Sequence, residues 1–121
     1  MKTMLIVDDS IFARSLIKIM IRDINIKVVG EAHNGRIGVE KYKELKPDIV
    51  TMDIAMDELT GLEALKEIMA YDPGATVIMI SSIAGQEAFI VEATKAGAVK
   101  LFVKPVKKSQ FVSYLNELIM K

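Results

Sequence analysis

The chain has 121 residues, of which 51% are hydrophobic, and its 16 basic and 16 acidic residues cancel to a net charge of zero. This length predicts a single domain over residues 1–121 with a hydrophobic core, and the charge balance does not indicate nucleic acid or a membrane as a partner. Cysteine is absent and histidine occurs once, which argues against disulfides, cysteine-ligated metals and multi-histidine sites. No apolar run has the length of a signal peptide or membrane span, so we expect a soluble cytoplasmic protein.

The chain begins with an apolar run of strand length. Residues 4–7 predict the first strand, and the carboxylates Asp8 and Asp9 follow it directly. A helix is expected next, with Asp9 or Ser10 as its N-cap. Its apolar residues recur at helical spacing: Phe12, Leu16, Ile19 and Met20.

The second and third strands flank another helix. A weak strand is predicted at 27–30, followed by a loop and a helix at 36–45. This helix is expected to bury Ile37, Tyr42 and Leu45. A third strand at 48–53 is a nearly unbroken run of β-formers, as in buried strands of parallel sheets, and ends abruptly at Asp53. The remaining predicted elements are helices at 62–69, at 86–96 with Gly97 as C-cap, and from Ser109 onward, and strands at 76–80 and 99–103.

Five strand–helix units without a linker predict a doubly wound α/β domain with a five-stranded parallel sheet and helices on both faces. In such sheets ligands bind at the carboxyl ends of the strands, which lie at one edge. Four of the predicted strands end in polar side chains. They are Asp8 and Asp9, Asp53, Ser81 and Ser82, and Lys104.

These side chains suit the chemistry of phosphate. Three carboxylates at one edge would raise one another's pKa unless a cation compensates. Mg²⁺ is suited to this role because it binds a few carboxylate oxygens while keeping water and phosphate oxygens. Lys104 and a serine hydroxyl suit the oxygens of a phosphoryl group. The pattern therefore indicates phosphoryl transfer to Asp53, since carboxylates can form acyl phosphates.

Taken together and in this order, these motifs resemble those of the receiver domains of two-component response regulators, in particular the single-domain chemotaxis type. The resemblance covers essentially the whole chain. It implies a flavodoxin-like sheet in the order 2-1-3-4-5. It also implies a signalling switch rather than an enzyme, phosphorylated by a sensor histidine kinase in a Mg²⁺-dependent reaction, with a role in chemotaxis or motility.

The resemblance also implies roles for individual residues. Asp53 matches the phosphoacceptor, and Lys104 would pair with a phosphate oxygen. Asp9 would bind Mg²⁺ directly, and Asp8 would do so directly or through water. The backbone carbonyl of Ala55 would supply another ligand. The family's Lys-Pro peptide after the last strand, here at 104–105, is typically cis.

The switch hydroxyl is either Ser81 or Ser82. Ser81 directly follows the apolar run, whereas the usual family interval counted back from Lys104 selects Ser82. A one-residue insertion at 83–85 would reconcile the two, and we favour Ser81. The family's aromatic switch position holds Leu101.

The neighbour of Leu101, Phe102, is expected to face the opposite side of the strand. We therefore predict switching through the loop 83–85 and the helix at 86–96. In the family that helix, the last strand and the last helix form the face that meets a downstream motor, adaptor or phosphotransfer protein. We expect a monomer that meets its partner there.

Other classes of protein explain the pattern less well. A haloacid-dehalogenase-type phosphatase needs a second aspartate where this chain has Ala55. A flavodoxin-type electron carrier needs a phosphate-binding loop where this chain has Asp8 and Asp9. A degenerate receiver that only binds protein is a further alternative, although no member of the acidic set is missing. A phosphorelay intermediate that shuttles phosphate between histidine-containing proteins is the main alternative.

Overall fold

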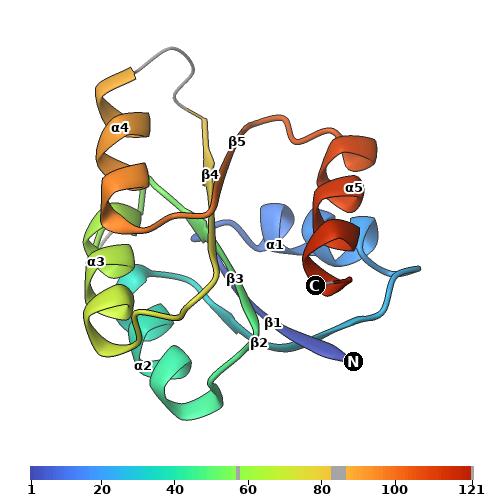
Figure 1. The fold of residues 1–121 in the computed structure, drawn as a ribbon, viewed down its shortest axis with the longest axis horizontal. Helices are drawn as coiled ribbons and strands as arrows, with labels where there is room; N and C mark the ends of the chain where they lie inside the picture. Colours follow the sequence, from blue (N-terminus) through green and yellow to red (C-terminus); the bar gives the residue numbers. More distant parts are fainter. Residues whose placement is uncertain (57, 83–86, 121) are drawn as a thin grey trace.

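The computed structural model describes residues 1–56, 58–82 and 87–120. Five parallel strands form one sheet in the order β2-β1-β3-β4-β5, with helices on both faces (Figure 1). This architecture confirms the predicted fold class and strand order. The expectations for the loop 83–85 and for a helix start at Gln86 concern residues outside the described ranges.

Strands and helices alternate along the chain, as the sequence predicts. Side chains cap three of the helices: Ser10, Asn34 and Thr60 each accept a hydrogen bond from a backbone N–H in the first turn. None of the described helices is both long and apolar enough to cross a membrane. The elements are β1 (Lys2–Val7), α1 (Ile11–Met20), β2 (Ile26–Ala32), α2 (Gly35–Leu45), β3 (Ile49–Asp53), α3 (Gly61–Tyr71), β4 (Val77–Ser81), α4 (Glu87–Ala96), β5 (Lys100–Val103) and α5 (Lys108–Ile119).

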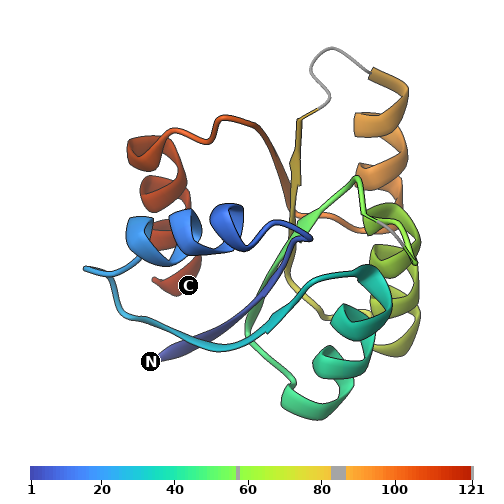
Figure 2. The same ribbon diagram turned by 180° about the vertical axis from the view of Figure 1, so that it is seen from behind.

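The sheet separates two hydrophobic cores. Helices α2, α3 and α4 cover one face, and α1 and α5 cover the other (Figures 1 and 2). Side chains of β3 alternate between them: Val50 and Met52 belong to the first core, and Ile49 belongs to the second. The central strands β1, β3 and β4 are therefore buried on both sides, which explains their continuous apolar sequences.

Two details differ from the sequence-based expectation. In α1 the buried residue is Ile17, whereas Phe12, Leu16 and Ile19 are 70%, 44% and 51% exposed. The helix turns Ile17 and the following Ile21 toward the sheet, one position beyond the apolar stripe that the spacing suggested. Leu45 was expected to be buried but is 36% exposed, because α2 ends there and its side chain lies over Gly30 of the edge strand β2.

Candidate functional site

The turn between β1 and α1 holds two neighbouring carboxylates in different environments. Asp8 is buried, and its Oδ1 accepts a hydrogen bond of 2.9 Å from the backbone N–H of Ser10. The Ser10 hydroxyl oxygen accepts in turn from the N–H of Ala13, which caps α1. Asp9 is exposed. The cap therefore fixes the turn with one carboxylate inside the protein and the next one at the surface.

Asp53 is the last residue of β3 and is 4% exposed. Gly61 lies close to this strand end, where its N–H donates to the carbonyl of Ile54 over 2.9 Å. A Cβ atom at Gly61 would clash with the carbonyl oxygen of Asp53, so the close approach requires glycine. The glycine that begins α3 thus helps to hold Asp53 at the edge of the sheet.

Lys104 brings a positive charge to this edge from the far side of β4. Its Nζ lies 3.0 Å from Oδ2 of Asp8 and 3.6 Å from Oδ1 of Asp53. Its backbone N–H donates to the carbonyl of Ser81 over 2.7 Å, which joins the ends of β5 and β4. The Lys104–Pro105 peptide is cis, as the family resemblance implies.

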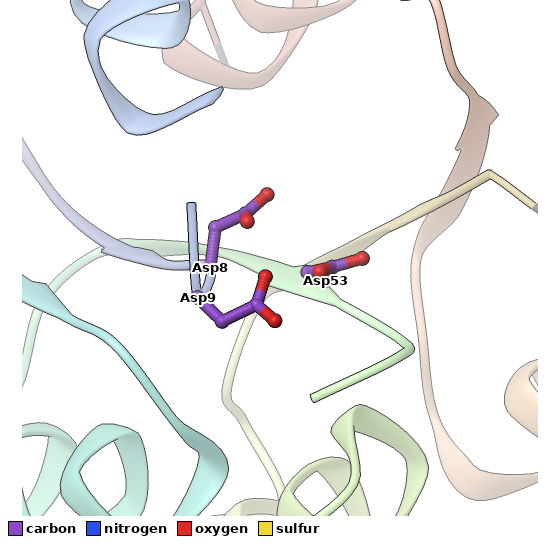
Figure 3. Close-up of side chains that lie close together, drawn as sticks. All are labelled: Asp8, Asp9 and Asp53. Carbon is purple, nitrogen blue, oxygen red and sulfur yellow. The ribbon is translucent and has the colours of Figure 1, made fainter. Parts of the chain in front are cut away.

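The carboxylates of Asp8, Asp9 and Asp53 converge at the carboxyl edge of the sheet (Figure 3). One oxygen from each lies within 4.8 Å of the others. Burial, followed by the charge of Asp8, raises the pKa of Asp53 from 3.8 to about 6, although Lys104 opposes the shift. Burial also opposes the charge of Lys104, but its hydrogen bond to Asp8 and the charge of Asp53 outweigh burial and raise its pKa. The edge therefore holds more negative charge than Lys104 compensates.

This donor set fits a hard divalent cation. All the converging groups are carboxylate oxygens, which Mg²⁺ prefers, and Asp9 is open to solvent, so that water could complete the coordination. Such a cation would also relieve the repulsion that raises the pKa of Asp53. Ala55 lies beside this cluster, and its backbone N–H donates a hydrogen bond to Asp53.

The remaining expected site residues lie at the ends of β4 and β5. Ser81 is the last residue of β4 and is 3% exposed, whereas Ser82 follows the strand and is exposed. Leu101 packs against the core formed with α2, α3 and α4. Phe102 belongs to the opposite core and makes an edge-to-face contact with Phe111, which confirms that the two neighbours face opposite sides of β5.

Arg14, which the sequence analysis did not single out, also reaches the β1–α1 turn. Its Nη1 donates to the backbone carbonyl oxygen of Asp8 over 2.6 Å. The sequence did carry a signal for it. Arg14 lies only one turn after the N-cap Ser10, where the helix dipole disfavours a positive charge. A cation at such a position suggests that a specific acceptor binds it.

Comparison with known sequences identifies the family. A family model described as the response regulator receiver domain matches residues 4–116. Chemotaxis protein CheY of Thermotoga maritima is 53% identical over 117 residues, which cover 97% of this chain and 97% of that protein. Chemotaxis protein CheY of Bacillus subtilis is 44% identical over 115 residues, which cover 95% of each chain.

Solved structures of response regulators have the same fold as this chain. The response regulator domain of Thermotoga maritima CheB aligns with a TM-score of 0.85 and 42% identity, covering 98% of this chain and 93% of that one. A chain of the CheX-CheY-BeF3-Mg²⁺ complex from Borrelia burgdorferi aligns with a TM-score of 0.93 and 32% identity, covering 99% of this chain and 90% of that one.

Proposed function

Since the chain belongs to the response regulator receiver domain family, we propose that it is a single receiver domain that accepts a phosphoryl group on Asp53 and thereby switches its binding to a partner protein. The observation that carries this proposal is the convergence of Asp8, Asp9 and Asp53 beside Lys104. It is a signalling switch, and we expect no turnover of an external substrate.

Asp53 is the proposed nucleophile. One carboxylate oxygen attacks the phosphorus of a phosphohistidine on the donor kinase, so that an O–P bond forms while the N–P bond breaks. The imidazole nitrogen keeps the electron pair of the broken bond and takes up a proton. Lys104 already lies 3.6 Å from Asp53 and would pair with an oxygen of the transferred group.

Asp8, Asp9 and Asp53 would hold Mg²⁺, together with the backbone carbonyl of Ala55. When bound, the ion would neutralise charge on the phosphoryl oxygens and on the carboxylates themselves. The chain's own contribution is to hold the carboxylates in place. The raised pKa of Asp53 reflects how unfavourable burial and the charge of Asp8 make its ionised form.

Phosphorylation must favour one of two conformations if it is to carry a signal. We propose that Ser81, buried at the end of β4, is the hydroxyl that responds, with Ser82 as the alternative. Lys104 would respond together with it, because its backbone N–H is bonded to the carbonyl of Ser81. A change at the site would therefore reach the ends of β4 and β5 together.

The partner surface is proposed to lie over α4, β5 and α5. A groove of about 740 Å³ runs between β5 and α5 and is lined in part by Lys100, Leu101 and Tyr114. The Lys100 ammonium lies 5.6 Å from the centre of the Tyr114 ring, so the groove combines a positive charge with an aromatic surface. It suits an acidic segment of a downstream protein, and we expect the chain to meet that protein as a monomer.

A role in chemotaxis or motility is the form of signalling that we favour. Chemotaxis proteins CheY of Thermotoga maritima, Listeria monocytogenes and Bacillus subtilis match this chain over nearly their whole length. A phosphorelay intermediate would pass its phosphate to a second histidine-containing protein, and nothing in the site or among these relatives favours that role.

The test is incubation with Mg²⁺ and acetyl phosphate, followed by intact mass measurement and mapping of the modified residue. We expect a gain of one phosphoryl group on Asp53 that is lost in Asp53→Asn. The matched control is Asp48→Asn at the other end of the same strand segment, which should be labelled like the parent protein. Undiminished labelling of Asp53→Asn would refute the assignment.

A further inference from the structure

We propose that Arg14 is a positioning residue for the metal ligands Asp8 and Asp9, an inference that rests on the magnesium site proposed above. Arg14 lies in α1, and its side chain is only 14% exposed. It donates from Nη1 to the carbonyl oxygen of Asp8 over 2.6 Å and from Nε to Oε1 of Glu31 over 3.0 Å. One guanidinium group thus connects the acidic turn to the end of β2.

The carbonyl that Arg14 binds belongs to the peptide that joins the two ligands. The side chain of Asp8 is already held at both oxygens, by the N–H of Ser10 and by Lys104. The Asp9 carboxylate is exposed and accepts no hydrogen bond from any residue that the structure describes. Its direction therefore depends on the backbone, and the bond from Arg14 fixes the peptide plane that precedes it.

Glu31 keeps Arg14 in place. Its Oε2 also accepts from Lys18 over 2.9 Å, and its backbone carbonyl accepts from Lys41 over 2.6 Å. The hydrogen bond from Lys18, together with that from Arg14, holds the pKa of Glu31 below its usual value, so that the carboxylate stays charged at neutral pH. Arg14 therefore has a fixed, ionised anchor on a neighbouring strand.

The charge of Arg14 and its proposed positioning role predict opposite effects on Mg²⁺ binding when the side chain is removed. A guanidinium group beside the acidic cluster repels a divalent cation, so its removal should tighten Mg²⁺ binding if electrostatics dominate. If Arg14 orients the ligands, its removal should weaken Mg²⁺ binding. The direction of the change separates the two roles, and it also differs from a purely structural loss, which would lower stability without changing the affinity.

The experiment measures the Mg²⁺ dissociation constant of the whole chain by isothermal titration calorimetry, with the melting temperature in chelator as a separate measure of folding. Arg14→Met keeps the length and helix preference of the side chain but removes its hydrogen bonds. We expect its dissociation constant to rise about tenfold, the usual effect of losing a group that orients a metal ligand.

Lys18→Met is the matched control. It removes a cation from the same helix and the same partner, Glu31, which is the only hydrogen-bond partner of Lys18 among the described residues. Its dissociation constant should stay the same or fall slightly. Arg14→Lys keeps the charge and most of the packing, and we expect a smaller loss of affinity because a single ammonium replaces the planar donor group.

An unchanged or lower dissociation constant in Arg14→Met would overturn the inference, even if its melting temperature falls. If Arg14→Met does not fold, the same result in Arg14→Lys would overturn it. A parent protein that fails to bind Mg²⁺ would instead refute the proposed function, so the two failures can be told apart.

Discussion

The two ends of β3 carry aspartates in opposite electrostatic states. Asp48, just before the strand, accepts hydrogen bonds from the backbone N–H and the hydroxyl of Thr3. These bonds, above all the one from the backbone N–H, lower the pKa of Asp48. Asp53, the last residue of the strand, is buried near Asp8 and has its pKa raised to about 6. The same side chain is therefore stabilised as an anion at one end and destabilised at the other.

The two aspartates also differ in what surrounds them: Asp48 stabilises the sheet, whereas Asp53 lies at the candidate site. Asp48 lies at the amino end of the parallel sheet, where its charge fastens β3 to β1. Asp53 lies at the carboxyl end, where ligands bind in sheets of this kind. In the function proposed above, the unfavourable charge there is the cost of keeping a carboxylate ready for a cation and a phosphoryl group.

The largest stability effect that we predict concerns Asp53→Asn in the absence of metal. A pKa raised in the folded state means that stability falls as pH rises from about 4 to about 6, because the folded state binds its proton more tightly than the unfolded chain. The rise from 3.8 to about 6 corresponds to at most about 3 kcal/mol. Asparagine cannot ionise, so the variant should be more stable than the parent at neutral pH.

Urea unfolding in chelator, repeated from neutral pH to about pH 4, measures this difference. The advantage of Asp53→Asn should shrink as the pH falls below about 6 and the parent's Asp53 becomes protonated. An advantage that does not change with pH would show that repulsion at the site is not its cause.

The next effect is the stabilisation of the folded protein by Mg²⁺. In the proposed function Mg²⁺ binds where folding brings the carboxylates together, so it should stabilise the folded parent by about 2.7 kcal/mol at about 100 times its dissociation constant. Asp9→Ala should lose most of this gain, and its metal-free form should be no less stable, since Asp9 is exposed and contributes to the repulsion at Asp53. Melting temperatures at increasing Mg²⁺ measure both quantities, and a parent indifferent to Mg²⁺ would contradict the site.

Much of this site could be predicted from the sequence, because each of its main side chains directly follows a strand. Asp8, Asp53 and Lys104 each stand at the end of an apolar run, and a parallel sheet brings such ends to one edge. The family resemblance supplied the strand order and the cis peptide at 104–105, and the structure has both.

What the sequence did not predict depends on contacts between distant segments. The partners of Arg14 are visible only once α1 lies beside the end of β2, which brings its side chain to Glu31. The exposure of Phe12 follows from the exact rotation of α1 on the sheet, which spacing alone does not determine. Local patterns show which residues share a face, whereas packing decides how far that face turns toward the core.

A smaller effect is predicted for Asp48→Ala at the other end of β3. The change removes the acceptor for the two groups of Thr3, and we expect a loss of about 1 kcal/mol at neutral pH. Because the pKa of Asp48 is lowered in the folded state, this contribution is present above pH 3.8 and should vanish as the pH falls further. The pH dependence would thus begin lower than that of Asp53→Asn, and a loss that persists in acid would contradict the charged hydrogen bond.

The last predicted effect, of similar size, concerns Thr51, which lies between the two aspartates. Thr51 is 1% exposed, and its hydroxyl finds no hydrogen-bond partner among the residues that the structure describes. Thr51→Val replaces a desolvated hydroxyl with a methyl group of similar size, so we expect a gain of about 1 kcal/mol. The matched change Thr3→Val removes a hydroxyl that is bonded to Asp48 and should cost stability instead. Urea unfolding of the two variants should therefore give changes of opposite sign, and a loss of stability in Thr51→Val would show that this hydroxyl is satisfied in solution.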